Sequence, residues 1–149
     1  MNGLNALNAH FLAMPPVAAM QVQALAYDGV VLRLQAPLAA NVNDKGCAFG
    51  GSMAGLMTLA GWGLLTLRLE AEGLPAEVYV ADSHVRYLKP LYGDLGAEAQ
   101  LEPDVDWTTF LRTYRERGRA RAGVLATLRD PAGTVVAQLN GRVAALRTA

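Results

Sequence analysis

The chain has 149 residues and a mass of 15.8 kDa, with 52% hydrophobic and 17% charged residues. This length and composition predict a single globular domain over residues 1–149. Thirteen basic residues balance thirteen acidic ones, so we expect neither a nucleic-acid-binding protein nor one drawn to anionic membranes. The single cysteine, Cys47, excludes an intrachain disulfide and a multi-cysteine zinc site, and it is typical of a reducing compartment.

Two segments bear on location. Residues 1–20 contain no Lys or Arg and are interrupted by Pro15 and Pro16, so they lack the features of a signal peptide, and we expect a cytoplasmic protein. Residues 46–67 carry no charge and are long enough to span a bilayer. Glycines and threonines dilute this segment, and no Lys/Arg asymmetry flanks it, which favours a helix buried in protein.

The first predicted elements are a helix and a β-hairpin. Apolar residues at helical spacing predict a helix over residues 4–12. Residues 21–27 and 30–35 predict two strands that are joined at Asp28 and Gly29, where glycine supplies the positive φ of a two-residue hairpin turn.

A long helix is predicted next. A polar loop over residues 39–49 leads into a helix over residues 51–72, which ends at the Gly-Leu-Pro of residues 73–75. Most of the remaining chain is predicted to form strands, at residues 77–88, 97–102, 122–128 and 134–146.

A second, short helix interrupts these strands. Apolar residues recur at i, i+3, i+4 and i+7, namely Trp107, Phe110, Leu111 and Tyr114. Asp106 is the predicted N-cap and Gly118 the stop. A strand is the alternative, because two threonines directly precede Phe110.

This order of elements predicts an α+β protein in which an antiparallel sheet wraps around one long central helix. An antiparallel sheet can be apolar on one face only, and a helix that is apolar all round needs cover on several sides. One subunit leaves a sheet edge and part of the helix uncovered. We therefore expect a homodimer or a dimer of dimers.

Three stretches of the sequence resemble the hotdog-fold thioesterases. They are residues 41–52 (Asn-Val-Asn-Asp-Lys-Gly-Cys-Ala-Phe-Gly-Gly-Ser), 59–63 (Leu-Ala-Gly-Trp-Gly) and 83–90 (Ser-His-Val-Arg-Tyr-Leu-Lys-Pro). In particular, the chain is similar to the thioesterase domain that follows an N-acetyltransferase domain in some bacterial proteins. The resemblance implies a hotdog fold and hydrolysis of an acyl thioester of coenzyme A or of acyl carrier protein. We expect no cofactor and no metal site.

The resemblance also implies a site at the start of the long helix. Related acyl-CoA thioesterases carry Asn-x-x-Gly-x-x-His-Gly-Gly there, with a catalytic carboxylate about two turns further along. The matching residues in this chain are Asn43, Gly46, Gly50 and Gly51. Phe49 stands in the histidine position, and Thr58 stands in the position of the carboxylate, so the general base of those relatives is missing.

The residues of this loop have a chemistry of their own. Gly50 and Gly51 at a helix N-terminus would let a carbonyl oxygen approach bare N–H groups and the positive end of the helix. The alternative is that they only permit a tight loop. Asn43 would hold the carbonyl or a water, or would simply shape the turn. Asp44 is the nearest carboxylate, unless it is a solvated partner of Lys45.

Four residues are predicted to contact the substrate. Phe49 and Ser52 adjoin the glycines, although Ser52 is also an ordinary residue for a first helical turn. Arg119 and Arg121 belong to an arginine-rich stretch that would hold the phosphates of coenzyme A. The alternative for each arginine is a solvated surface position.

An alternative catalytic pair lies on the strand over residues 77–88. Asp82 and His84 are two residues apart and would face the same side, together with Val80 and Arg86. Such a pair could perform acid–base chemistry near neutral pH. The opposite side of the strand is more apolar and is predicted to cover the helix; it consists of Tyr79, Ala81, Ser83, Val85 and Tyr87. Asp82, His84 and Arg86 would then form a polar cluster on the outer side or between subunits.

Three functions therefore compete. The first is a thioester hydrolase that uses attack by water and the Gly50 N–H group as oxyanion donor. The second is a non-catalytic module that binds acyl thioesters and has lost the base. The third, a hotdog-fold dehydratase, would need Asp82 and His84 to reach the groove.

Overall fold

The long uncharged segment forms the central helix of the protein. In the computed structural model, which describes residues 3–148, helix α3 runs from Gly50 to Ala71 and is buried around most of its circumference. One side, with Leu59, Trp62 and Thr66, is only partly buried. Gly61 and Gly63 let the sheet come close, because a Cβ at either position would lie 2.9 Å from a side-chain carbon of Val124 or Leu32. None of the helices in residues 3–148 is long and apolar enough to cross a membrane.

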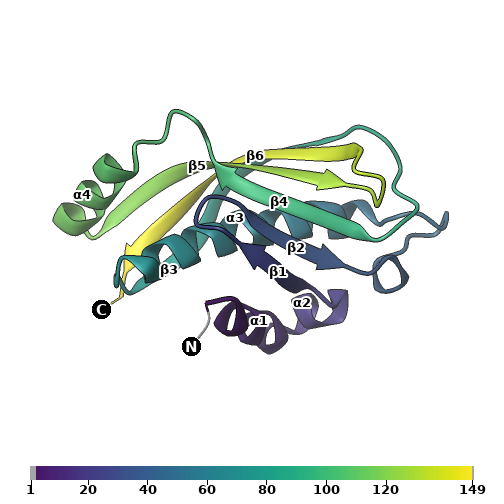
Figure 1. Ribbon diagram of the computed structural model, residues 1–149, viewed down its shortest axis with the longest axis horizontal. Coiled ribbons are helices and arrows are strands. Elements are labelled where there is room, and N and C mark those ends of the chain that lie inside the picture. Colours follow the sequence, from purple (N-terminus) through teal and green to yellow (C-terminus); the bar gives the residue numbers. More distant parts are fainter. Residues whose placement is uncertain (1–2, 149) are drawn as a thin grey trace.

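A six-stranded antiparallel sheet wraps around α3 (Figure 1). The strand order is β1-β2-β4-β5-β6-β3. The strands are β1 (Gln23–Tyr27), β2 (Leu32–Ala36), β3 (Ala76–Tyr87), β4 (Leu95–Leu101), β5 (Arg119–Arg129) and β6 (Val135–Arg147). Strands β2 to β6 all contact α3, and alternate residues of β4 and β5 point into the core they share. This is the predicted hotdog arrangement of one sheet around one helix.

The N-terminal helices cover one edge of the sheet. Helix α1 (Gly3–Ala13) packs against β1, and its Asn8 side chain accepts from the Ala24 N–H at 2.7 Å and donates to the Ala24 carbonyl at 3.3 Å. Asn8 thus replaces a neighbouring strand at this edge. A second helix, α2 (Pro15–Met20), was not predicted, because prolines that end one helix also suit the first turn of the next.

Helix α4 (Trp107–Arg117) confirms the helical interpretation of this segment over the strand. The Asp106 carboxylate accepts from the Thr109 N–H at 3.2 Å, and Gly118 ends the helix at φ 73°. The Tyr114 hydroxyl donates to the Pro75 carbonyl at 2.6 Å. This bond places α4 beside the chain that leaves the C-terminal end of α3, at one end of the molecule (Figure 1).

Strand β3 changes its helix-facing side at a β-bulge between Val80 and Asp82. Val80 lies opposite the buried Val143, whereas Asp82 lies opposite the exposed Arg142. The prediction was therefore wrong for the first half of the strand: Val80 faces the helix, and Tyr79 faces outward. The extra residue of a bulge shifts the alternation by one, and the sequence pattern does not reveal it.

Beyond the bulge the predicted faces are confirmed. Ser83 and Val85 lie opposite the buried Gly141 and Leu139, so this side covers the helix, and Tyr87 shares it. Asp82, His84 and Arg86 lie on the outer side of the sheet.

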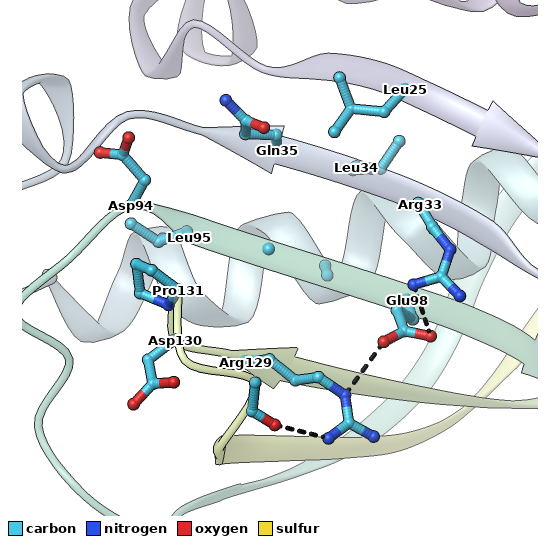
Figure 2. Close-up of a pocket in the computed structure, with 13 residues that line it drawn as sticks. Leu25, Arg33, Leu34, Gln35, Asp94, Leu95, Glu98, Arg129, Asp130 and Pro131 are labelled. Atoms are coloured by element: carbon cyan, nitrogen blue, oxygen red, sulfur yellow. Dashed lines mark hydrogen bonds and ion pairs between the residues drawn. The ribbon is translucent and has the colours of Figure 1, made fainter.

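The outer face of the sheet carries a shallow groove of about 410 Å³ across β2, β4 and β5. Figure 2 shows the Glu98 carboxylate between two guanidinium groups. Its oxygens lie 3.1 Å from Arg33 and 3.0 Å from Arg129, and Arg129 also donates to the Gly133 carbonyl at 2.9 Å. These contacts join three neighbouring strands on their solvent side, a cross-strand stabilisation typical of sheets.

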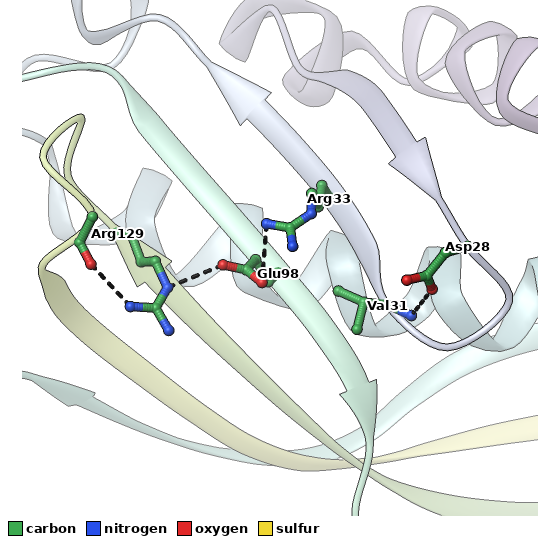
Figure 3. Close-up of polar contacts among 6 residues, drawn as sticks. Asp28, Val31, Arg33, Glu98 and Arg129 are labelled. Carbon is green, nitrogen blue, oxygen red and sulfur yellow. Dashed lines mark hydrogen bonds and ion pairs between the residues drawn. The ribbon is translucent and has the colours of Figure 1, made fainter.

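The hairpin between β1 and β2 forms as predicted, but its turn is longer. The loop covers residues 28–31 rather than two residues, and Tyr27 pairs with Leu32. The Asp28 carboxylate accepts from the N–H groups of Val30 (2.9 Å) and Val31 (2.7 Å), as Figure 3 shows for Val31. An aspartate side chain that accepts hydrogen bonds from the N–H groups two and three residues further along the chain stabilises such a wider turn.

Candidate functional site

The loop before α3 is shaped by the side chain of Asn43. Its Oδ1 accepts from the N–H groups of Lys45 at 2.7 Å and Cys47 at 3.2 Å, and its Nδ2 donates to the Cys47 sulfur at 3.2 Å. Gly46 closes the turn at φ 84°, a conformation that favours glycine. Asn43 therefore makes the contacts expected of a residue that shapes the turn, which was the alternative to a role in holding the substrate carbonyl or a water.

A second asparagine, Asn41, anchors the same loop from a buried position. The sequence alone did not mark it as important. Asn41 is 3% exposed, and its Nδ2 donates to the carbonyls of Met20 (2.9 Å) and Pro37 (2.8 Å). The main-chain carbonyl of Asn41 accepts from the Phe49 N–H at 2.7 Å. Only its place in the asparagine-rich start of the motif could have drawn attention to it. These bonds fix where helix α3 begins.

The first turn of α3 presents free main-chain donors. Phe49 is the N-cap, and the first helical hydrogen bond runs from the Met53 N–H to the Phe49 carbonyl at 3.0 Å. The N–H groups of Gly50, Gly51 and Ser52 precede that bond, and a phenylalanine side chain cannot cap them. This end of the helix carries a partial positive charge. The geometry suits a developing oxyanion.

Two exposed aromatic rings flank these donors. Phe49 is 56% exposed, and its ring lies so close over Gly51 that a Cβ there would collide with it. Tyr87, 53% exposed, donates from its hydroxyl to the Gly50 carbonyl at 3.1 Å. From the sequence, Tyr87 is predicted only as part of a strand and not as a site residue. Its predicted position on the face of the strand that covers the helix was the signal that could have identified it.

Thr58 does not reach the helix start within the same chain. It lies eight residues beyond Gly50, which is about 12 Å along an α-helix. Together with Val80 and Ser83 it lines a small cavity of about 10 Å³ under the bulge of β3. Ser52 lies in the first turn and is buried.

The nearest carboxylate in sequence is turned toward solvent. Asp44 is exposed and forms an ion pair with Lys45 at 2.9 Å, as the surface-pair alternative expects. No hydrogen bond joins Asp44 to the helix start within residues 3–148, so this chain does not show which group would act as the general base.

Asp82 and His84 lie on the outer side of β3, whereas Tyr87 and the helix start lie on its inner side. Asp82 binds Arg142, whose Nε donates to it at 3.0 Å. The hydrogen bond from Arg142 lowers the pKa of the Asp82 carboxyl below its ordinary value. Asp82 is thus an ion-pair partner of β6, and no hydrogen bond joins it to His84 among the described residues.

Arg119 and Arg121 are exposed on β5, directly after α4. Helix α4 lies near the C-terminal end of α3, because Trp107 donates to Glu72 at 3.3 Å. The 22-residue helix α3 is about 33 Å long, so these arginines and Gly50 lie toward opposite ends of the chain's fold. The fold of a single chain does not bring them to the same ligand.

The fold and this helix start define a hotdog protein of the thioesterase class, and comparison with known proteins gives the family. Residues 6–147 match the family model described as "Putative thioesterase (yiiD_Cterm)". The chain belongs to this family. Its activity is therefore of the thioesterase type.

Solved structures agree with the fold. A protein of unknown function from Chlorobaculum tepidum has a TM-score of 0.90 at 27% identity, over 97% of this chain and 94% of that one. A putative thioesterase from Shewanella oneidensis has a TM-score of 0.86 at 28% identity, over 97% of both chains. A thioesterase from Haemophilus influenzae has a TM-score of 0.76 at 16% identity, over 99% of this chain and 92% of that one, and this likeness concerns the fold alone.

Proposed function

We propose that the protein hydrolyses an acyl thioester of coenzyme A or of acyl carrier protein. Water attacks the thioester carbonyl, the Gly50 N–H binds the oxyanion that develops, and the C–S bond breaks to release a thiol and a carboxylic acid. One observation carries the proposal: the first turn of α3 offers uncapped N–H groups between the exposed rings of Phe49 and Tyr87, in a member of a thioesterase family.

We further propose that the site is completed in a homodimer. A water held at Thr58 cannot reach a carbonyl held at Gly50 of the same helix, because the two residues are about 12 Å apart. Strands β1 and β3 are the two edges of the sheet in residues 3–148, and Asn8 of α1 already bonds the main chain of β1. Unpaired edges of this length associate readily.

The contacts of β3 favour one register for this pairing. Trp62 donates from its indole Nε1 to the Val78 carbonyl at 2.7 Å, which covers the first part of the edge. Among residues 3–148, the main chain of residues 82–87 forms no hydrogen bond outside its pairing with β6. A two-fold axis at His84 would place Asp82 opposite the second copy's Arg86, whereas an axis at Asp82 would place two like charges together. In the favoured register Tyr87 and the helix start lie next to the second copy's Ala81, above its Thr58.

The proline variant Gly50→Pro tests the oxyanion donor. Proline suits the first helical position, Phe49 already has the extended conformation that a following proline requires (φ −65°, ψ 130°), and only the N–H is lost. We expect kcat to fall about 100-fold or more. Gly50→Ala is the matched control: it keeps the N–H, and its Cβ would lie 3.6 Å from the Tyr87 ring, an ordinary contact. Equal activity of Gly50→Pro and wild type would contradict the proposal.

A second candidate is a module that binds acyl thioesters without cleaving them. It is favoured by the threonine at position 58 and by the contact of Asp44 with Lys45. Restoring a carboxylate decides between the two. Thr58→Asp or Thr58→Glu should raise the hydrolysis rate about tenfold or more, equivalent to about 1.4 kcal/mol of barrier. Thr108→Asp, an exposed position on α4, is the control. No hydrolysis by any form, with binding of a non-hydrolysable acyl-CoA analogue, would establish the binding module.

The dimer has its own test. Light scattering at micromolar concentration should give about 31.6 kDa, twice the chain mass of 15.8 kDa, or a tetramer of twice that. A stable species of 15.8 kDa would contradict both the dimer and the shared site.

A further inference from the structure

A second cleft, of about 460 Å³, lies between α1, the C-terminal half of α3 and the start of β3. Its walls are largely apolar and include Trp62, Leu69, Leu74, Ala76 and Val78. The indole N–H of Trp62 is already bonded to the Val78 carbonyl, so its ring offers the cleft an apolar surface. The titratable groups at the cleft are His10, Glu70, Glu77 and Tyr79.

The cleft is out of reach of the Gly50 site in its own subunit. Trp62 is twelve residues beyond Gly50, about 18 Å along α3. In the dimer proposed above, Tyr87 of one copy lies beside the second copy's Ala81, three residues from its Val78. The helix start of each copy then faces the mouth of the other copy's cleft.

We propose that this cleft binds the acyl group of the thioester whose carbonyl is held at the second copy's Gly50. The proposal rests on the proposed thioesterase function and deepens it. A volume of about 460 Å³ accommodates on the order of fifteen carbon-sized groups, if each takes about 30 Å³ as a water molecule does. With its open mouth, the cleft suits an acyl chain of about eight to twelve carbons. Two carboxylates, Glu70 and Glu77, favour an uncharged chain end over an acidic one.

Chain-length profiles test the cleft. For wild type, kcat/KM should rise about fourfold per methylene until the cleft is full. Ala76→Leu narrows the cleft and should lower kcat/KM for decanoyl-CoA about tenfold or more, while butyryl-CoA changes less than about twofold. Ala132→Leu, in the exposed turn before β6, is the matched control and should leave both values unchanged.

A mixing experiment tests whether the cleft and the oxyanion donor come from different copies. Differently tagged Gly50→Pro and Ala76→Leu chains are co-expressed, and the mixed dimers are purified by both tags. Each mixed dimer contains one site with both parts intact, so it should hydrolyse decanoyl-CoA at about half the wild-type rate. If both parts belonged to the same copy, no site would be intact, and the mixed dimer would stay as impaired as its parents.

The outcomes separate this inference from the function on which it rests. Absence of hydrolysis at every chain length refutes the thioesterase function. Hydrolysis with a flat chain-length profile, or with an Ala76→Leu variant that behaves like wild type on decanoyl-CoA, refutes the acyl cleft and leaves the thioesterase function standing. Hydrolysis with a steep profile and no recovery in the mixed dimer refutes the shared site.

Discussion

The variant Tyr87→Phe removes one hydroxyl at the helix start and keeps the ring. The hydroxyl donates to the Gly50 carbonyl at 3.1 Å, and that carbonyl belongs to the same peptide group as the Gly51 N–H. Tyr87 therefore orients the Gly50–Gly51 peptide without touching the substrate's reacting atoms. Because the side chain is 53% exposed, water replaces part of the lost bond, and we expect the free energy of unfolding to fall by only about 0.5–1 kcal/mol.

The effect on activity should be distinct from this loss of stability. A freer Gly50–Gly51 peptide loosens the residue that carries the oxyanion donor, so the Gly50 N–H is aimed less well at the oxyanion. We expect kcat to fall about three- to tenfold while KM changes less than about twofold. Steady-state hydrolysis of the best acyl-CoA substrate measures both constants, and urea unfolding measures stability. Tyr27→Phe, on β1, is the control for a tyrosine far from the site along the chain. An unchanged kcat alongside the expected loss of stability would show that the hydroxyl serves only the fold.

Two further variants test the loop and the outer face. Asn43→Ala removes the acceptor of the Lys45 and Cys47 N–H groups. It should lower the free energy of unfolding by about 1–2 kcal/mol, and it should also lower the hydrolysis rate. An unchanged rate would exclude a role of this loop in the reaction. Asp82→Asn removes a carboxyl whose folded pKa is lowered by Arg142, so wild type should be the more stable protein above the ordinary aspartate pKa of about 3.9. The extra stability of wild type should vanish as pH falls through the lower folded pKa, while kcat at neutral pH should be the same for both proteins. Urea unfolding from pH 3 to 8 measures the stability of each protein. A difference in unfolding free energy that does not change with pH would contradict the reasoning.

The sequence by itself determined the elements whose signals are local. The apolar run interrupted by glycines predicted α3 to within one residue at each end, because a helix buried around most of its circumference needs no charged face. Asp106 and Gly118 predicted both ends of α4, because capping depends on residues within one turn. The glycines at the start of α3 likewise marked the candidate site.

Only the tertiary structure decided how these pieces meet. The bulge between Val80 and Asp82 reversed the faces of half of β3, because one inserted residue changes the alternation without changing composition. Tyr87 donates to Gly50, which is 37 residues away in the sequence, and Arg142 donates to Asp82, which is 60 residues away. Both hydrogen bonds therefore depend on how distant elements align. Hydrophobic patterning specifies which residues are buried, but the partner of each polar group depends on where packing brings the chain together.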